Sequence, residues 1–187
     1  MATKLIVSQI LTAEQCQPWV TEADYRASES FSPQRRAEYL SWRALLSQHM
    51  GRVVEVGYDA VGAPVVVGGD GNIGVSHTAG RVAVVVSDAA CAVDIEHAGR
   101  DVSRISDRFM TATERALVVD NRTAVAIWSA RECYYKLLRD KALRLLTDIA
   151  VTDIDLASGV VAVADSRGGS ARLNITEQQG YIVVYTA

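Results

Sequence analysis

The sequence predicts an α+β fold made of two similar halves, residues 1–88 and 89–187, packed as one compact unit. A strand, a capped short helix, a long helix and further strands occur in this order once in each half, which indicates an internal duplication. Helices and strands are grouped rather than strictly alternating, which favours an α+β fold over a doubly wound parallel sheet. The 187 residues suffice for one ordinary domain or for two small lobes that share a core.

The first half begins with a predicted strand over residues 4–10. Thr12 and Gln15 have the S/T-x-x-E/Q spacing of a capping box, which opens a short helix. After a long helix, glycine turns separate four further strand segments, at residues 53–59, 65–67, 73–77 and 81–87.

The long helix of the first half is predicted over residues 33–50. Ser32 can act as its N-cap, and Gly51 ends it. Apolar side chains recur every three or four residues along one face, whereas Arg36 and Arg43 lie seven residues apart on another.

The second half opens with a predicted strand over residues 91–96, followed by a helix over residues 102–109. Thr111 and Glu114 form a second capping box. The strongest helical pattern in the chain covers residues 122–138. The half ends in strands at residues 149–156, 160–164, 171–175 and 181–186.

Composition excludes several classes of protein. A formal net charge of -3 provides no bulk attraction to nucleic acid or to an anionic membrane. The longest apolar runs have the length of a strand and cannot span a bilayer, and the N-terminal residues lack the apolar core of a signal peptide. Cys16, Cys91 and Cys133 fit neither a disulfide framework nor a zinc site, so we expect reduced thiols in the cytoplasm.

Two carboxylates stand close together in the strand at 91–96. Asp94 and Glu96 leave the same face, because side chains alternate along a strand and Ile95 points the other way. Such like charges repel unless a positive group lies between them, and a divalent cation is the usual solution. A solvated strand face is the alternative, and it would be favoured if this pair stood alone.

A third carboxylate, Glu132, lies on the apolar face of the 122–138 helix, where it must be paired, protonated or bound to a metal. Lys136, one turn further on, is a candidate partner, although such a pair is also common on exposed helix surfaces. Together with the strand pair, Glu132 would supply the hard oxygen ligands that Mg²⁺ prefers. Arg36, Arg43 and His77 offer further charge for phosphates, so the set predicts a phosphoryl-transfer site.

Four motifs resemble those of the 4′-phosphopantetheinyl transferases, in particular their pseudo-dimeric, Sfp-like branch. That family has G-K-P, a segment ending in S-H-S/T, G-V-D-I-E and W-S/T-x-K-E-A-x-x-K in this order. The corresponding segments are GAP at 62–64, NIGVSHT at 72–78, AVDIE at 92–96 and WSARECYYK at 128–136, within a resemblance that runs from about residue 35 to residue 136.

The resemblance implies that the chain transfers the 4′-phosphopantetheine arm of coenzyme A to a serine of an acyl or peptidyl carrier protein, releasing adenosine 3′,5′-bisphosphate. It also implies that the active site lies between the two halves, so that a monomer completes it. Asp94, Glu96 and Glu132 would hold Mg²⁺ against the pyrophosphate. Glu132, or a metal-bound water that it orients, would act as general base, and Lys136 would neutralise phosphate charge.

By the same resemblance, His77 would contact the 3′-phosphate of coenzyme A, with Ser76 beside it. Arg43 and Arg36 would contact the phosphates of the same molecule. Glu114 falls where the family has an acid near the metal, but its capping-box spacing alone accounts for it, and we favour that interpretation.

Three positions depart from the family pattern. Ala63 replaces the lysine of G-K-P, Arg131 replaces the first lysine of the W-S-x-K-E motif, and residues 137–146 lack the usual glycine-rich turn, which would allow a longer helix. These changes leave a second interpretation open, a coenzyme A-binding module of the same fold with lost or reduced turnover. A purely structural α+β domain is the third.

Overall fold

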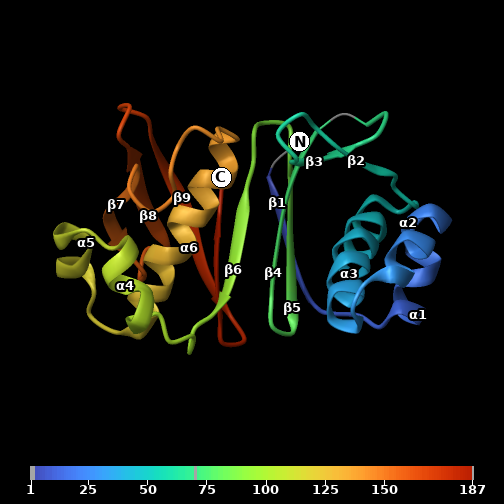
Figure 1. The fold of residues 1–187 in the computed structure, drawn as a ribbon, viewed down its shortest axis with the longest axis horizontal. Coiled ribbons are helices and arrows are strands. Elements are labelled where there is room, and N and C mark those ends of the chain that lie inside the picture. The colour runs from blue at the N-terminus through green and yellow to red at the C-terminus, as the bar shows by residue number, and fades with distance from the viewer. Residues whose placement is uncertain (1–2, 70, 187) are drawn as a thin grey trace. The chain divides into compact units, whose positions relative to one another are not determined.

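The computed structural model describes residues 3–69 and 71–186, and the chain divides into two compact units, Met1–Ala90 and Cys91–Ala187 (Figure 1). Both units combine helices with antiparallel sheet, which confirms the predicted α+β class. No helix within the described residues has the length and apolar character needed to cross a membrane.

The first unit contains a three-stranded antiparallel sheet in the order β1-β5-β4 and a separate hairpin, β2-β3. Its elements are β1 (Lys4–Gln9), α1 (Ala13–Cys16), η1 (Gln17–Trp19), α2 (Glu22–Ala27), η2 (Ser28–Ser30), α3 (Pro33–Met50), β2 (Val56–Tyr58), β3 (Pro64–Val66), β4 (Asn72–Thr78) and β5 (Arg81–Ser87). The predicted strands and the long helix are confirmed within a few residues at each end. The helix α2 and the two 3₁₀ turns were not predicted from the sequence.

The predicted signals set the ends of α3. The Ser32 side chain accepts a hydrogen bond from the Arg35 amide, and Gly51 ends the helix in the left-handed conformation at φ 67°. One side of the helix packs on β5 through Trp42 and Leu46. Another side packs on α1 and its neighbours, so α3 is the centre of this unit.

The second unit contains a five-stranded antiparallel sheet in the order β6-β10-β9-β8-β7, and α6 lies across it (Figure 1). Its elements are β6 (Val93–His97), α4 (Ser103–Phe109), α5 (Ala112–Leu117), α6 (Asn121–Leu138), β7 (Ile149–Asp155), β8 (Val160–Asp165), β9 (Ser170–Gln178) and β10 (Tyr181–Tyr185). The buried face of α6 packs on the sheet through residues such as Val125, Ile127 and Ala130.

The helix α6 begins at an N-cap that the sequence analysis did not identify, Asp120, whose side chain accepts from the Thr123 amide at 2.8 Å. It ends at Leu138, so the absence of glycine does not lengthen it. Arg139 takes the left-handed conformation at φ 51° that glycine usually occupies after a helix.

The two units share an order of elements. In each, the first strand pairs with the last strand, and the strand before the last lies next in the sheet: β1-β5-β4 in one unit and β6-β10-β9 in the other. An 18-residue helix precedes these last strands in both. This topology agrees with the internal duplication indicated by the sequence.

Candidate functional site

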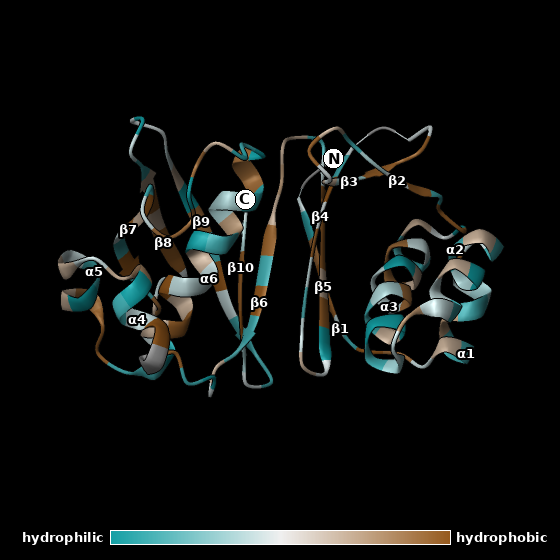
Figure 2. Cartoon of the chain, viewed as in Figure 1, coloured by the Kyte–Doolittle hydropathy of each residue, from teal (hydrophilic) through white to brown (hydrophobic). Residues whose placement is uncertain are grey.

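The strand β6 and the helix α6 bring together four of the predicted site residues. Asp94 and Glu96 lie on the face of β6 that α6 covers, since both carboxylates accept hydrogen bonds from α6 side chains. Polar and apolar positions are mixed along β6 (Figure 2). The predicted placement of both carboxylates on one strand face is confirmed, and the solvated-face alternative is wrong for Asp94, which is only 5% exposed.

Asp94 accepts hydrogen bonds from two side chains of α6 that lie two turns apart. Ser129 Oγ donates to Oδ2 at 2.6 Å, and Lys136 Nζ donates to Oδ1 at 2.7 Å. Lys136 also donates to the Val93 carbonyl at 3.3 Å. The carboxylate therefore has a fixed orientation and a charge partner, which a buried acid needs.

Lys136 is the cation of this pair, and its side chain remains 34% exposed. Removal from water disfavours the ammonium, but the charge and hydrogen bond of Asp94, with the nearby Glu132, outweigh this effect and raise the pKa of Lys136 above its ordinary value. The lysine thus stays charged at neutral pH, with part of its surface accessible to a ligand.

Glu96 has two different partners. Trp128 Nε1 donates to its Oε1 at 3.3 Å, and Arg100, in the loop after β6, donates to the same oxygen through Nη1. Trp128 in turn packs edge-to-face on Phe109 with a centroid distance of 5.0 Å. Trp128 therefore anchors α6 and also orients a carboxylate.

Glu132 lies half-buried on α6, close enough to the other acids to feel their charge. Burial raises the pKa of its carboxyl group, Asp94 and Glu96 raise it further, and Lys136 and Arg100 lower it in part. A carboxylate whose proton affinity is raised by its neighbours is suited to accept a proton.

The donor chemistry of these carboxylates fits Mg²⁺, which prefers hard oxygen ligands and relieves repulsion among like charges. Burial raises the pKa of Glu132, and the like charges of Asp94 and Glu96 add to this effect, as expected for carboxylates held close together. In residues 3–69 and 71–186, however, no group of three or more His, Cys, Asp or Glu side chains is already arranged as a metal site. Asp94 and Glu96 are instead paired with cations, so their predicted ligand roles stay predictions and require some rearrangement of side chains.

Glu114 has a structural role away from these acids. Its carboxylate completes the predicted capping box by accepting from the Thr111 amide at 2.7 Å. It also accepts from the Val151 amide at 2.8 Å and from Arg131 Nη1 at 2.6 Å. Glu114 is fully buried and the Arg131 side chain is 1% exposed, so this is a buried ion pair that joins α5, α6 and β7.

The departure at Arg131 now has a physical explanation. Besides Glu114, its guanidinium donates to the carbonyl groups of Leu145 and Leu146, at 3.0 and 2.9 Å. A planar group with several donors can hold one carboxylate and two carbonyl groups at once, which an ammonium group cannot do with the same geometry. Arg131 therefore fixes the glycine-free segment that follows α6.

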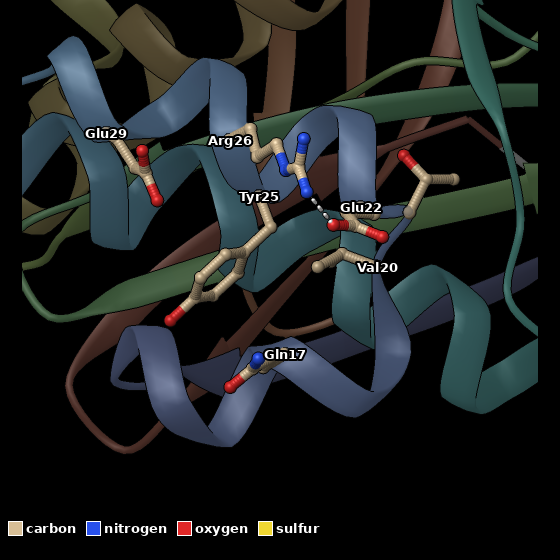
Figure 3. Close-up of a pocket in the computed structure, with 7 residues that line it drawn as sticks. Gln17, Val20, Glu22, Tyr25, Arg26 and Glu29 are labelled. Carbon is tan, nitrogen blue, oxygen red and sulfur yellow. Dashed lines mark hydrogen bonds and ion pairs between the residues drawn. The ribbon is translucent and has the colours of Figure 1, made fainter.

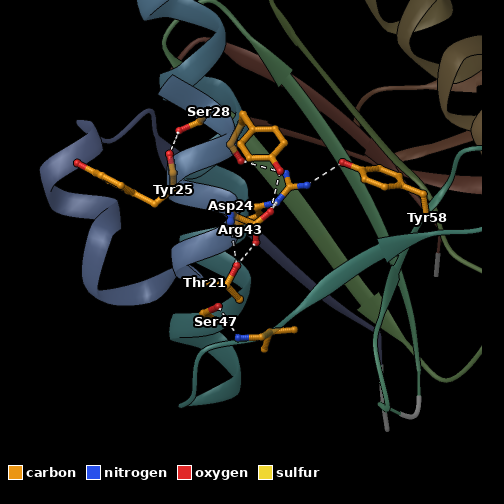
Figure 4. Close-up of polar contacts among 9 residues, drawn as sticks. Thr21, Asp24, Tyr25, Ser28, Arg43, Ser47 and Tyr58 are labelled. Atoms are coloured by element: carbon orange, nitrogen blue, oxygen red, sulfur yellow. Dashed lines mark hydrogen bonds and ion pairs between the residues drawn. The ribbon is translucent and has the colours of Figure 1, made fainter. Parts of the chain in front are cut away.

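In the first unit, Arg43 is enclosed rather than presented to solvent (Figure 4). It donates to Asp24 Oδ1 at 3.0 Å, to the Tyr39 carbonyl at 3.2 Å and to the Tyr58 hydroxyl at 2.8 Å, and it is 1% exposed. Its guanidinium carbon lies 3.5 Å from the centroid of the Tyr39 ring. The predicted phosphate contact of Arg43 stays a prediction, and a ligand oxygen could reach this group only if its surroundings open.

The other predicted cofactor residues of this unit lie on α3 and β4. Arg36 is half-buried over the Tyr25 ring at 4.9 Å. His77 Nδ1 lies 3.6 Å from a carboxylate oxygen of Glu38 on α3. Ser76 is buried and, as the preceding residue in the same strand, points to the opposite face from His77. The side chains of Ser76 and His77 therefore do not lie together, and their ligand contacts remain predictions.

A pocket of about 440 Å³ opens at the surface of the first unit beside α2 (Figure 3). Gln17, Val20, Thr21, Glu22, Tyr25, Arg26 and Glu29 line it. Glu22 and Arg26 pair with each other across one turn, and both are largely exposed. None of the predicted site residues lines this pocket.

Two residues that act on the acids were missed in the sequence. Ser129 carries a signal, because it lies three residues before Glu132 and seven before Lys136, on the same face of α6. Arg100 carries none, because its contact with Glu96 depends on the path of the loop after β6.

A family model described as the 4′-phosphopantetheinyl transferase superfamily matches residues 90–185, more than half of the chain. The matched segment contains Asp94, Glu96, Glu132 and Lys136, whereas the predicted cofactor residues of the first unit lie outside it. A comparison with curated proteins finds no significant match.

Proposed function

Because the chain belongs to the 4′-phosphopantetheinyl transferase superfamily, and so is a transferase of phosphopantetheinyl groups, we propose the following reaction. It transfers the 4′-phosphopantetheine group of coenzyme A to a serine of an apo acyl or peptidyl carrier protein. The reaction depends on Mg²⁺ and releases adenosine 3′,5′-bisphosphate. The enzyme belongs to the pseudo-dimeric, Sfp-like branch, has residues 1–88 and 89–187 as its two halves, and acts as a monomer.

One observation carries this proposal: Asp94 of β6 and Lys136 of α6 are held together next to a second carboxylate, Glu132 of α6. Lys136 Nζ lies 2.7 Å from Asp94 Oδ1, and burial together with the charge of Asp94 raises the pKa of Glu132. A charged lysine can offset phosphate charge, a fixed acid can position that lysine, and an acid with raised proton affinity can accept the proton of the attacking hydroxyl group.

In the proposed step, the serine oxygen of the carrier protein attacks the phosphorus that bears the pantetheine arm. A new P–O bond forms as the bond to the adenosine 3′,5′-bisphosphate oxygen breaks, and the electron pair leaves with that oxygen. Glu132 accepts the serine proton. Lys136 faces the phosphate oxygens and offsets their growing negative charge, while Asp94 keeps the ammonium group in position.

Asp94, Glu96 and Glu132 would hold the magnesium ion, which would neutralise the pyrophosphate and favour departure of the leaving group. Arg36, Arg43, Ser76 and His77 are the proposed contacts of coenzyme A in the first unit, with His77 at the 3′-phosphate. The free thiols of the three cysteines support a reducing compartment such as the cytoplasm.

Release of adenosine 3′,5′-bisphosphate, measured with and without Mg²⁺ and an apo carrier protein, tests the proposal. We expect release only when both are present, and loss of release in Lys136→Gln. Arg144→Gln is the matched control, since it removes one exposed cation of the same unit that pairs only with Asp148 among the described contacts. If coenzyme A binds but no release occurs with any carrier protein, the chain is a binding module rather than an enzyme.

A further inference from the structure

Arg100 is a cation of the acid cluster that none of the family motifs contains. Its Nη1 donates to Glu96 Oε1, the same oxygen that accepts from Trp128, and its guanidinium carbon lies 5.6 Å from the centroid of the Trp128 ring. Its charge also acts on Glu132. Arg100 thus touches one proposed metal ligand and acts electrostatically on another.

The loop that carries Arg100 is fixed to the rest of the unit. Asn121 Nδ2, at the start of α6, donates to the carbonyl groups of Ala98 and Arg100 at 3.0 and 3.1 Å. The Arg100 amide donates to the His97 carbonyl at 2.9 Å. Its side chain is nevertheless 38% exposed, so the guanidinium can move into solvent without unfolding the loop.

Charge balance shows what this placement does. Asp94, Glu96 and Glu132 carry three negative charges, and Lys136 with Arg100 supplies two positive ones. A divalent cation among the same carboxylates would add two more. Both side chains are partly exposed, but Lys136 is tied to both Asp94 and the Val93 carbonyl, so Arg100 is the cation that is easier to displace.

We propose that Arg100 is a built-in counter-ion that competes with the divalent metal for Glu96. In the metal-free protein it pairs with Glu96 and limits repulsion within the cluster. When a metal binds, the guanidinium gives up Glu96 and turns towards solvent. Arg100 thereby lowers the metal affinity of the site, an inference that rests on the proposed function.

Mn²⁺ binding, followed by the electron paramagnetic resonance signal of the free ion, tests this role without any transferase assay. Arg100→Gln should bind Mn²⁺ about tenfold more tightly than the parent at low salt, because a unit positive charge close to a divalent ion is removed. High salt should reduce the difference. Arg100→Lys keeps the charge and should stay near the parent.

Arg115→Gln is the matched control, since it removes an exposed arginine of the same unit whose described partner is Asp107, and it should leave Mn²⁺ binding unchanged. Thermal unfolding gives a second readout. Metal-free Arg100→Gln should melt at a lower temperature than the parent and gain more from a fixed Mn²⁺ concentration.

Equal or weaker Mn²⁺ binding by Arg100→Gln would overturn the inference while leaving the metal site itself intact. Two other results would count against the proposed function as well. If Asp94→Asn binds Mn²⁺ as the parent does, or if neither the parent nor Arg100→Gln binds it, the acids are not a metal site, and both proposals fail.

Discussion

Replacing Glu114 by glutamine should destabilise the protein strongly without changing metal binding. The carboxylate is fully buried and accepts from the Thr111 and Val151 amides and from Arg131. Glutamine keeps the shape but removes the charge, and its amide nitrogen faces a donor. The Arg131 guanidinium, itself buried, is left without a counter-charge.

The size of the effect follows from these contacts. Removing one member of a buried ion pair typically costs about 3–5 kcal/mol, because the remaining charge stays desolvated. This is a large fraction of the ~5–15 kcal/mol stability of an ordinary protein. Guanidinium chloride unfolding, monitored by circular dichroism, should therefore show a much lower midpoint for Glu114→Gln.

Asp107→Asn provides the control, since Asp107 pairs with Arg115 at the surface and its side chain is 91% exposed. Its unfolding midpoint should stay close to that of the parent. If Glu114→Gln unfolds within about 1 kcal/mol of the parent, the buried-pair reasoning is refuted. If it loses Mn²⁺ affinity while keeping its stability, Glu114 is a metal ligand after all.

Three further predictions concern other polar and charged side chains of the two units. Arg43→Lys should lower the free energy of unfolding by about 2–5 kcal/mol, because a lysine cannot donate to Asp24, the Tyr39 carbonyl and Tyr58 at the same time. Chemical unfolding measures this change, and an unchanged midpoint would show that the positive charge alone matters. Ser129→Ala should reduce transferase turnover roughly tenfold, because Asp94 loses the hydrogen bond that positions it, and should lower the free energy of unfolding by about 1–3 kcal/mol. Full turnover in a steady-state assay would exclude this positioning role. Folding raises the pKa of Glu132, so the folded protein holds the Glu132 proton more tightly than the unfolded chain does. Protonated Glu132 therefore stabilises the fold below the ordinary pKa of 4.5, and this stabilisation is lost as the pH rises through the folded-state pKa. Glu132→Gln, measured with a chelator present, should therefore be more stable than the parent at neutral pH and lose that advantage in acid; a constant difference across this range would contradict the raised pKa.

The elements of the fold were largely predictable, because local chemistry determines them. The capping boxes at Thr12 and Thr111 form hydrogen bonds within a few residues of chain, and the left-handed conformation of Gly51 is a property of that residue itself. The helix α2 was missed because six residues give too little hydrophobic periodicity to distinguish a helix from a turn.

The acid cluster was predictable in part. Strand alternation placed Asp94 and Glu96 on one face, and helical spacing placed Glu132 and Lys136 one turn apart. The partner of Glu96 could not be predicted, because the contact of Arg100 is set by the fold of a loop. Charge alone was also misleading for Arg43. The helical pattern placed it on a polar face, but three hydrogen-bond acceptors and three aromatic rings enclose its guanidinium.

The central claim is transfer of a phosphopantetheine group, and intact-mass spectrometry of a carrier protein tests it most directly. Candidate apo acyl and peptidyl carrier proteins are incubated with the protein, coenzyme A and Mg²⁺. We predict that at least one gains the mass of a single phosphopantetheine group on its serine, and that Asp94→Ala abolishes the gain. If no carrier protein gains this mass, or if Asp94→Ala modifies its carrier as fast as the parent does, the proposed mechanism is wrong.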